Sequence, residues 1–328
     1  MDKPMDVVRP RALRRGDTIA IVVPASPVPR EPIERAIAKL QAMDFRVKTY
    51  GDLYREHGYL AGDDSTRADE LMAAFVDAEV SAVFPARGGN GVTRLLDRLD
   101  YDAIAANPKI LAGFSDMTAL HSALQNRTGL VTFHSPHPKD GIGADDGMSD
   151  LTARTYWRAL LADEYADDAV GYEIPLSAAE REAVVTMRGG KSRGRLVGGN
   201  LALVCAMMGT PYETSTAGNL LLLEDVNEPP YRIDRFLAQL KLAGKLQELA
   251  GVVLGQFTDC RPAAEQASLS LDQVFDDYFA DLSIPIVRNY PTGHCRDNAT
   301  VPLGVEAELD ADARTIRLLN NPVLLDPS

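Results

Sequence analysis

Short, mostly apolar stretches alternate with helix-length segments over residues 17–134, and this alternation limits the possible folds more than any other feature of the sequence. The five predicted strands are 17–25, 45–50, 80–86, 109–114 and 130–134. In the first intervening segment, Ile33, Ile37 and Leu40 recur at helical spacing. Apolar strands separated by helices are typical of a parallel sheet covered on both faces. We therefore predict an α/β fold whose functional residues gather at the carboxyl ends of its strands.

The second half of the chain has a more mixed pattern. The elements expected there are strands at 219–225 and 251–257, a helix at 231–244, a glycine-rich turn opening a helix within 195–211, and a hairpin within 298–319 that turns at Asp310–Ala313. A polar stretch with one helix around 155–164 precedes them. We predict an N-terminal α/β domain over 1–140, a connection over 141–185, and a smaller, β-rich, barrel-like domain over 186–328.

The composition is that of an ordinary globular protein. The net charge of −13 disfavours nucleic acid as a partner, because a phosphate backbone attracts clustered Lys and Arg. No stretch approaches the roughly 20 apolar residues that span a bilayer, and no apolar segment follows the basic N-terminal residues as in a secretory signal. Cys205, Cys260 and Cys295 lie far apart, so we expect free thiols. These features favour a cytoplasmic protein.

The strongest local signal for chemistry lies where the fourth predicted strand ends. A buried strand runs into Gly113-Phe114-Ser115-Asp116, and a helix with an apolar face follows at once. A serine at such a turn presents its hydroxyl at the sheet edge, beside the unpaired N–H groups of a helix N-terminus. This is the logic of a nucleophile elbow, although Met117 stands where the second glycine would be. The alternative is that Ser115 only caps the helix.

A nucleophilic serine needs a base, and two of the five histidines are candidates. His294 lies in a loop of turn residues after a predicted strand, where its ring would be accessible. His134 ends the strand predicted beside Ser115 and is its rival. His121 is six positions along the same helix as Ser115, so it points elsewhere, roughly 9 Å up the axis.

The acid that orients this base is expected at the end of strand 219–225. Glu224 closes a run of four leucines, and a carboxylate at the edge of a buried strand should be paired or hydrogen-bonded. Side chains alternate along a strand, so Glu224 and Asp225 should face opposite ways and only one would serve. Glu228 is a further candidate in the loop that follows.

A glycine-rich turn, residues 87–91, follows the third predicted strand and admits two interpretations. Its spacing is not that of a dinucleotide-binding motif, so a cofactor is only weakly indicated. Alternatively, its bare glycines let backbone N–H groups approach an oxyanion opposite Ser115. A second pair, Gly198-Gly199, is predicted to be a simple helix entry.

Taken together and in this order, these segments resemble the LD-carboxypeptidase family, which includes muramoyltetrapeptide carboxypeptidases and microcin C immunity hydrolases. The resemblance runs nearly end to end and rests on GDTIAIVVPAS, RGGNG, GFSDMTAL, GGNLALV with the following GTP, LLLEDVNEPPYRIDRFLAQL, and PTGHCRDNATVPLG. It implies a Rossmann-like, or flavodoxin-like, N-terminal domain, a smaller β-rich C-terminal domain, and an active site at their junction. It also implies a homodimer, and neither a metal nor a cofactor.

The family's motifs assign roles to particular positions of this chain. They place its nucleophile on Ser115, its acid on Glu224 and its base on His294. The oxyanion donors fall on the backbone of three residues: Gly88, Gly89 and Asp116.

The residues expected near the substrate are Arg87, Asn90, His134 and Arg232. A carboxypeptidase also needs a donor for the terminal carboxylate of its substrate, and Arg87, Arg232 and Arg296 are candidates by position, among which the sequence does not choose. The family usually has an aromatic residue at the position of Asn90 and His-Gly-Pro where this chain has His134-Ser135-Pro136. Both departures bear on the substrate more than on the triad.

The activity that the resemblance implies is hydrolysis of an amide bond between an L-configured centre and a C-terminal D-amino acid. The expected substrate is a murein tetrapeptide that loses D-Ala. A hydrolase of peptidyl or aminoacyl nucleotides is the alternative with the same chemistry, and Trp157 is the only indole that could stack on a base. A non-catalytic nucleotide-binding Rossmann module is the alternative of another class, and it predicts indifference to Ser115→Ala.

Overall fold

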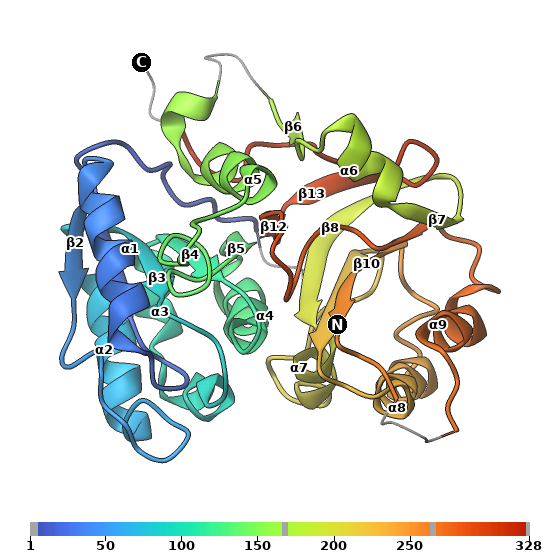
Figure 1. The fold of residues 1–328 in the computed structure, drawn as a ribbon, viewed down its shortest axis with the longest axis horizontal. Helices are drawn as coiled ribbons and strands as arrows, with labels where there is room; N and C mark the ends of the chain where they lie inside the picture. Colours follow the sequence, from blue (N-terminus) through green and yellow to red (C-terminus); the bar gives the residue numbers. More distant parts are fainter. Residues whose placement is uncertain (1–5, 166–169, 263–266, 326–328) are drawn as a thin grey trace.

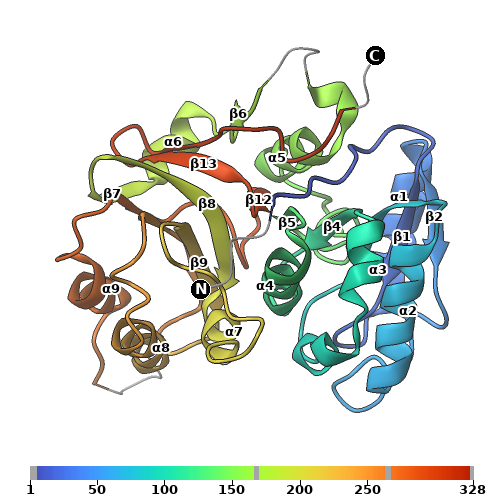
Figure 2. The same ribbon diagram turned by 180° about the vertical axis from the view of Figure 1, so that it is seen from behind.

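Two β-sheets lie side by side in the computed structural model, which describes residues 6–165, 170–262 and 267–325 (Figures 1 and 2). The first sheet has the strand order β12-β5-β4-β3-β1-β2. Its strands in chain order are β1 (Thr18–Val22), β2 (Arg46–Thr49), β3 (Val80–Pro85), β4 (Ile110–Gly113), β5 (Thr132–His134) and β12 (Val301–Leu303). The first five are parallel, as the sequence predicts, whereas β12 is antiparallel to β5.

Helices cover both faces of this sheet because neighbouring residues of a strand point to opposite sides. The helices are α1 (Arg30–Ala42), α2 (Asp64–Val76), α3 (Tyr101–Ala106), α4 (Met117–Thr128) and α5 (Asp150–Leu160). Ile19 and Ile21 of β1 share a core cluster with α1 and α5. Ala20 and Val22 belong to the opposite cluster, with α2, α3 and α4. The predicted two-sided burial is therefore confirmed.

The second sheet has the order β6-β14-β13-β8-β9-β10-β11-β7. Its strands are β6 (Tyr172–Glu173), β7 (Val185–Arg188), β8 (Lys191–Asn200), β9 (Leu220–Val226), β10 (Gly251–Thr258), β11 (Ile286–Arg288), β13 (Glu306–Asp310) and β14 (Thr315–Leu318). The helices of this half are α6 (Ala178–Ala183), α7 (Leu201–Ala206), α8 (Pro230–Leu242) and α9 (Leu271–Phe279). Short 3-10 helices lie at Val92–Arg94, Leu96–Arg98 and Ala162–Glu164. The last three α-helices pack on one face of the sheet through a core that includes Leu221, Leu223 and Val252.

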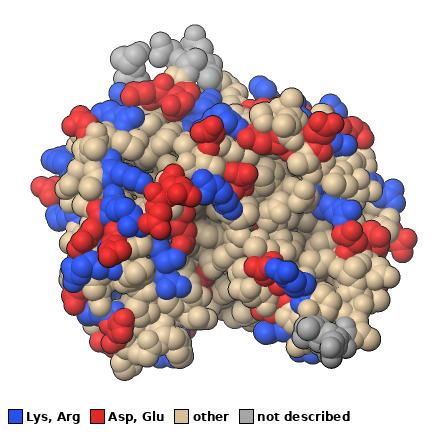
Figure 3. Space-filling model, in the orientation of Figure 1, with Lys and Arg blue, Asp and Glu red and all other residues tan. Residues whose placement is uncertain are grey.

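The two sheets are joined into one body. Leu196, Leu222 and Val253 of the second sheet belong to the same buried cluster as residues of β1, β3 and β4. Helix α4 contacts α7 and β8, so it lies between the halves (Figure 1). The space-filling view shows acidic and basic side chains interspersed over this face (Figure 3).

Two local predictions for the second half are right only in part. Gly198 and Gly199 do not form a turn but pair with β9 as the last part of β8, which runs directly into the predicted helix, α7. A Cβ on Gly198 would lie 2.2 Å from the Leu222 carbonyl oxygen, and one on Gly199 would lie 2.6 Å from Thr118 Oγ1. Residues 298–319 form more than a hairpin: β13 and β14 make the predicted pair, but β12 joins the other sheet.

Among the described residues, none of the helices combines the length and the apolar character that crossing a bilayer requires.

Candidate active site

Ser115 lies in the tight turn between β4 and α4. Its φ angle is 61°, in the left-handed region that residues other than glycine rarely adopt. The chain must turn sharply here, since a Cβ on Gly113 would lie 3.0 Å from Met117 Cγ. The side chain of Ser115 does not cap α4, because its hydroxyl is bonded elsewhere and Asp116 occupies the N-cap position. Backbone strain of this kind concentrates at functional sites.

Three side chains from remote parts of the chain form one hydrogen-bonded line. His294 Nε2 is 3.0 Å from Ser115 Oγ, and His294 Nδ1 is 2.7 Å from Glu224 Oε2. Glu224 stands near the carboxyl end of β9, and His294 lies in the loop between β11 and β12. This is the order nucleophile, base and orienting acid that general-base activation of a serine requires.

Glu224 is fully buried, and the backbone of the His294 loop leaves space for its side chain. Its Oε2 accepts hydrogen bonds from both the backbone N–H and the ring of His294, at 3.2 and 2.7 Å. Gly293, with φ 112°, leaves the necessary room, because a Cβ there would lie 2.7 Å from that same oxygen. Asn298, also buried, accepts a hydrogen bond from Gly293 N–H at 3.0 Å and thereby fixes the loop. Sequence reasoning missed Asn298, although it lies in the segment that carries His294.

The neighbouring carboxylate faces the opposite way, as strand alternation predicts. Asp225 accepts hydrogen bonds from Asn200 Nδ2 at 2.9 Å and from Ala202 N–H at 3.0 Å. Burial raises the pKa of Asp225 to about 6, against the effect of these bonds. Asp225 therefore joins β9 to the start of α7 and leaves Glu224 as the acid beside His294.

The surroundings of His294 favour its protonated form. Burial by itself lowers the pKa of this imidazole, but the hydrogen bond and the charge of Glu224 outweigh it, and the net pKa is raised above its usual value. A base whose conjugate acid is stabilised in this way accepts the proton of a serine hydroxyl more readily.

Two other buried histidines, His121 and His137, hydrogen-bond to the backbone of the turn between β4 and α4 and not to Ser115. His121 Nε2 donates to the Gly113 carbonyl oxygen at 2.8 Å, and His137 Nε2 accepts from Phe114 N–H at 3.2 Å. Burial lowers the pKa of His121 to about 3 and that of His137 well below its usual value, so both rings are neutral near pH 7. Sequence reasoning did not identify His137.

His134, the rival base, is fully buried in β5 and does not bond to Ser115. Its ring packs edge-on against Phe114, with centroids 5.8 Å apart, and burial lowers its pKa to about 4. Within the described part of the chain, neither of its ring nitrogens has a hydrogen-bond partner. His134 is therefore not the base that contacts Ser115 in this structure.

The glycine-rich turn after β3 lies directly against Ser115. A Cβ on Gly88 would be 2.8 Å from Ser115 Cβ and 3.1 Å from its Oγ. Only glycine permits this approach, which brings the backbone of the turn next to Ser115. Asp116, the N-cap residue of α4, follows Ser115 directly in the chain.

The arginines predicted near the substrate are engaged in different ways. Arg87 donates to the Pro27 carbonyl oxygen at 3.0 Å, and Arg232 pairs with Glu228 at 2.9 Å. Arg296 is exposed and pairs with Asp146 at 3.1 Å. Asn90 is exposed on the glycine turn. The sequence alone did not show which arginine is accessible to a substrate, but the contacts of each arginine in the structure differ.

Arg296 also lines a small cavity beside the triad. The cavity has a volume of about 210 Å³, and its walls include Phe114 and Cys295, the residues next to Ser115 and His294 in the chain. Asp140, Met148, Thr152 and Asn298 contribute further surface. The ring of Phe114 also contacts His294, with centroids 4.7 Å apart. The cavity therefore shares a wall with the triad.

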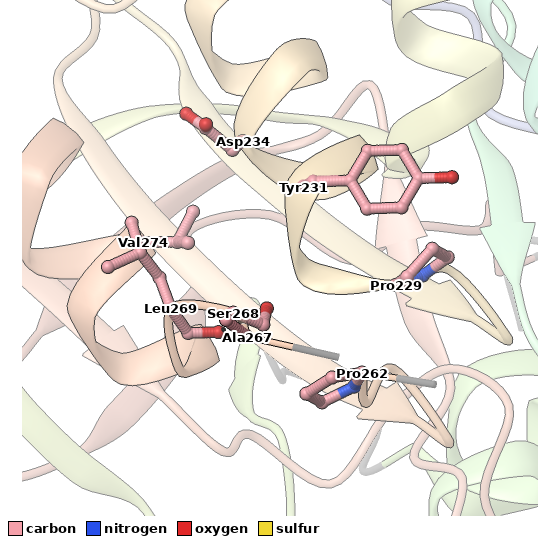
Figure 4. Close-up of a pocket in the computed structure, with 8 residues that line it drawn as sticks. All are labelled: Pro229, Tyr231, Asp234, Pro262, Ala267, Ser268, Leu269 and Val274. Carbon is pink, nitrogen blue, oxygen red and sulfur yellow. Dashed lines mark hydrogen bonds between the residues drawn. The ribbon is translucent and has the colours of Figure 1, made fainter. Parts of the chain in front are cut away.

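A second cavity, of about 260 Å³, lies away from the triad between α8 and α9 (Figure 4). Tyr231 and Asp234 reach it from α8 and Val274 from α9, while connecting segments supply Pro229, Pro262, Ala267, Ser268 and Leu269. None of the three triad residues lines it.

The cysteines and the acidic residues that the structure describes form no second reactive or metal-binding centre. Burial raises the pKa of each of the three cysteines to about 12, so their thiols stay protonated. Over residues 6–165, 170–262 and 267–325, no group of histidine, cysteine and acidic side chains is arranged to hold a metal ion.

Comparison with known proteins identifies one family in both halves of the chain. Residues 19–135 match the family described as LD-carboxypeptidase N-terminal domain, and residues 193–309 match LD-carboxypeptidase C-terminal domain. A probable murein peptide carboxypeptidase of Bacillus subtilis is 40% identical over 307 residues, covering 94% of this chain and 93% of that protein. The microcin C7 self-immunity protein MccF of Escherichia coli is 26% identical over 324 residues, covering 92% of this chain and 93% of that protein.

Solved structures agree with this result. A muramoyltetrapeptide carboxypeptidase from Oxalobacter formigenes superposes with a TM-score of 0.77 at 30% identity, covering 92% of this chain and 97% of that one. The two-domain α/β architecture is therefore shared.

Proposed function

The chain belongs to the LD-carboxypeptidase family, and we propose that it acts as a serine carboxypeptidase through Ser115, His294 and Glu224. Its substrate is a murein peptide, cleaved between an L-configured centre and a C-terminal D-amino acid. The observation that carries the proposed roles is the unbroken line of hydrogen bonds from Ser115 Oγ through the His294 ring to Glu224 Oε2.

In the proposed acylation step, Ser115 Oγ attacks the carbonyl carbon while His294 Nε2 takes its proton. Glu224 holds the proton of His294 on Nδ1 and stabilises the imidazolium that forms. The oxyanion of the tetrahedral intermediate would accept hydrogen bonds from the backbone of Gly88, Gly89 and Asp116. His294 then donates its proton to the leaving amine, and D-Ala departs.

In the proposed deacylation step, water replaces the amine. His294 takes a proton from the water as its oxygen attacks the ester carbonyl, and returns a proton to Ser115 Oγ when the intermediate collapses. Ser115 is then free and the shortened peptide carries a new carboxylate.

Arg296 is the proposed anchor for the carboxylate of the leaving amino acid. Of the three arginines considered, it lines a cavity that shares walls with the triad, and its guanidinium is exposed. A planar guanidinium suits paired hydrogen bonds to a carboxylate. An opening of about 210 Å³ suits a small amino acid better than an extended chain.

The nucleotide-hydrolase alternative has less support from this chain. It requires an aromatic platform for a base, but Trp157 lies in α5 and stacks on Phe45, with centroids 6.1 Å apart and planes 12° from parallel. Tyr156 packs against its edge at 4.9 Å. The indole is therefore occupied by packing.

The proposed setting is the cytoplasm, where a murein tetrapeptide would be recycled, and the proposed assembly is a homodimer. Light scattering of the purified protein tests the assembly: a mass near twice 35.6 kDa is expected, and a monomer would contradict it.

The function is tested by incubating the wild type and Ser115→Ala with a murein tetrapeptide and following D-Ala by mass spectrometry. Release by the wild type alone is expected, and the variant should keep the wild-type melting temperature because Ser115 is not a core residue. Release by both proteins, or by neither, would contradict the proposal.

A further inference from the structure

The turn that faces the nucleophile has few side chains with which to fix its own position. Gly89 and Gly91 have φ angles of 116° and 120°, and Gly88 must stay bare to fit against Ser115. Glycine gains this freedom at the cost of rigidity. Neighbouring residues must therefore hold the turn in place.

One of these neighbours is the residue next to the nucleophile itself. Asp116 Oδ2 accepts a hydrogen bond from Val92 N–H, at the end of the turn, at 2.9 Å. Asp116 is only 4% exposed, and burial raises the pKa of its carboxyl group to about 6, while the Val92 N–H and the charge of Arg67 oppose that rise. Because Asp116 is buried, water has little access to this hydrogen bond. The bond links the turn between β4 and α4 directly to the glycine-rich turn.

A buried arginine side chain also anchors the glycine-rich turn through hydrogen bonds. Arg67 of α2 is 1% exposed and donates to the Gly91 carbonyl oxygen at 3.0 Å and to the Gly62 carbonyl oxygen at 3.2 Å. It also bonds to the Pro24 carbonyl oxygen, in the loop after β1, and to Asp64 at 2.6 Å. The loops at this edge of the sheet therefore share one anchor.

We propose that the side chain of Asp116 is a positioning residue that fixes the oxyanion-binding turn against Ser115. The inference rests on the proposed function, since it concerns the same oxyanion. Asp116 would contribute twice: its backbone N–H points at the oxyanion, and its carboxylate sets the distance of the Gly88 and Gly89 N–H groups. The carboxylate itself does not touch the substrate.

The physical reason lies in how steeply such hydrogen bonds depend on position. Donors act on an oxyanion only when they lie about 2.7–3.1 Å from it, and removing one donor costs about 10²–10³ in kcat. Loss of the Asp116 carboxylate leaves the donors present but no longer held, so we expect a smaller loss, of about 10- to 100-fold.

The test uses a fluorophosphonate, whose capture does not depend on the identity of the peptide. Ser115 Oγ attacks phosphorus, fluoride leaves, His294 takes the serine proton, and a phosphoryl oxygen occupies the oxyanion site. We expect Asp116→Ala to slow this labelling by about 10- to 100-fold. In the peptide assay kcat should fall by a similar factor, with KM changed little.

Asp116→Asn and Asp100→Ala serve as matched variants. Asp116→Asn keeps an acceptor for Val92 N–H and should label at close to the wild-type rate. Asp100→Ala removes a carboxylate that accepts from Ala103 N–H at the same distance of 2.9 Å, at the cap of α3, and should not change the rate.

Each outcome has one meaning. Labelling of Asp116→Ala at the wild-type rate, or equal slowing of Asp116→Asn, overturns the inference and leaves the proposed function intact. Absence of labelling in the wild type overturns the proposed function instead. If Asp116→Ala does not fold, Asp116→Ser replaces it, because serine keeps a polar group at the N-cap of α4 but its hydroxyl is one bond shorter than the carboxylate that accepts from Val92 N–H. An unchanged rate in that variant also overturns the inference.

Discussion

Replacing Glu224 with glutamine should separate the charge of the acid from its shape. The carboxylate oxygen lies 2.7 Å from His294 Nδ1 in a fully buried position, whereas an amide of the same size carries no charge. Two unit charges 4 Å apart interact by about 4 kcal/mol at an effective dielectric constant of about 20. At 1.36 kcal/mol per factor of ten, we expect kcat to fall by about 10³-fold. KM should change little, because Glu224 stabilises an imidazolium that exists only during the reaction.

The same substitution should move the pH profile in a defined direction. In the wild type the pKa of His294 is raised above its usual value, and the base works only when neutral. Activity is therefore present at high pH and is lost as the pH falls through that raised pKa, so the acid limb of kcat/KM lies above about pH 6.5. Without the hydrogen bond and charge of Glu224, burial lowers the pKa against only the charges of Asp225 and Asp140, so the limb of Glu224→Gln should move to lower pH.

The assay is D-Ala release measured from pH 5 to 9 for the wild type, Glu224→Gln and Asp225→Asn. Asp225 is the matched control, because it is the adjacent buried carboxylate but bonds to Asn200 and Ala202. Its substitution should shift the limb much less. An acid limb that stays in place in Glu224→Gln, or that moves equally in Asp225→Asn, would refute the proposed role of Glu224.

Two further substitutions probe the walls of the site. Gly88→Ala places a methyl group 2.8 Å from Ser115 Cβ, so kcat should fall by at least about 10²-fold. The methyl group also overpacks a buried position, so the melting temperature should fall as well. Retention of full activity would show that the turn does not lie against Ser115. Arg296→Ala should raise KM for the tetrapeptide by about 10-fold, because it removes one charge-assisted hydrogen bond to the substrate. Arg232→Ala breaks only an ion pair with Glu228 and should leave KM unchanged. Equal KM values in the two arginine variants would remove Arg296 as the anchor.

Local patterns were enough to predict much of the first sheet and the position of Ser115. The apolar strands and the helices between them determine a two-sided parallel sheet, and a serine after a buried strand must then lie at its carboxyl edge. Alternation along β9 likewise separated Glu224 from Asp225 before any contact was known. These inferences need only residues that are close together in the chain.

Other features depend on contacts between remote segments and were not predictable in this way. Gly198 and Gly199 have the composition of a turn, but they lie inside a strand because they pair with Leu222 and Leu223 of β9, about 24 residues later in the chain. His137 gave no signal, since its role is to accept the N–H of Phe114, 23 residues earlier. Contacts between segments that are remote in the sequence decide such positions, and a periodic sequence pattern does not reveal those contacts.

The short strand β12 explains how a histidine of the second half reaches a serine of the first. The loop of His294 begins at β11, in the second sheet, and ends at β12, which pairs with β5 in the first sheet. Val301 lies opposite His134 in that pairing, only seven residues after His294. The loop is therefore tied to both sheets, and Asn298 and Glu224 fix its middle. Since both ends are held, the 3.0 Å distance between His294 and Ser115 is set by the fold itself and requires no closure of the two halves.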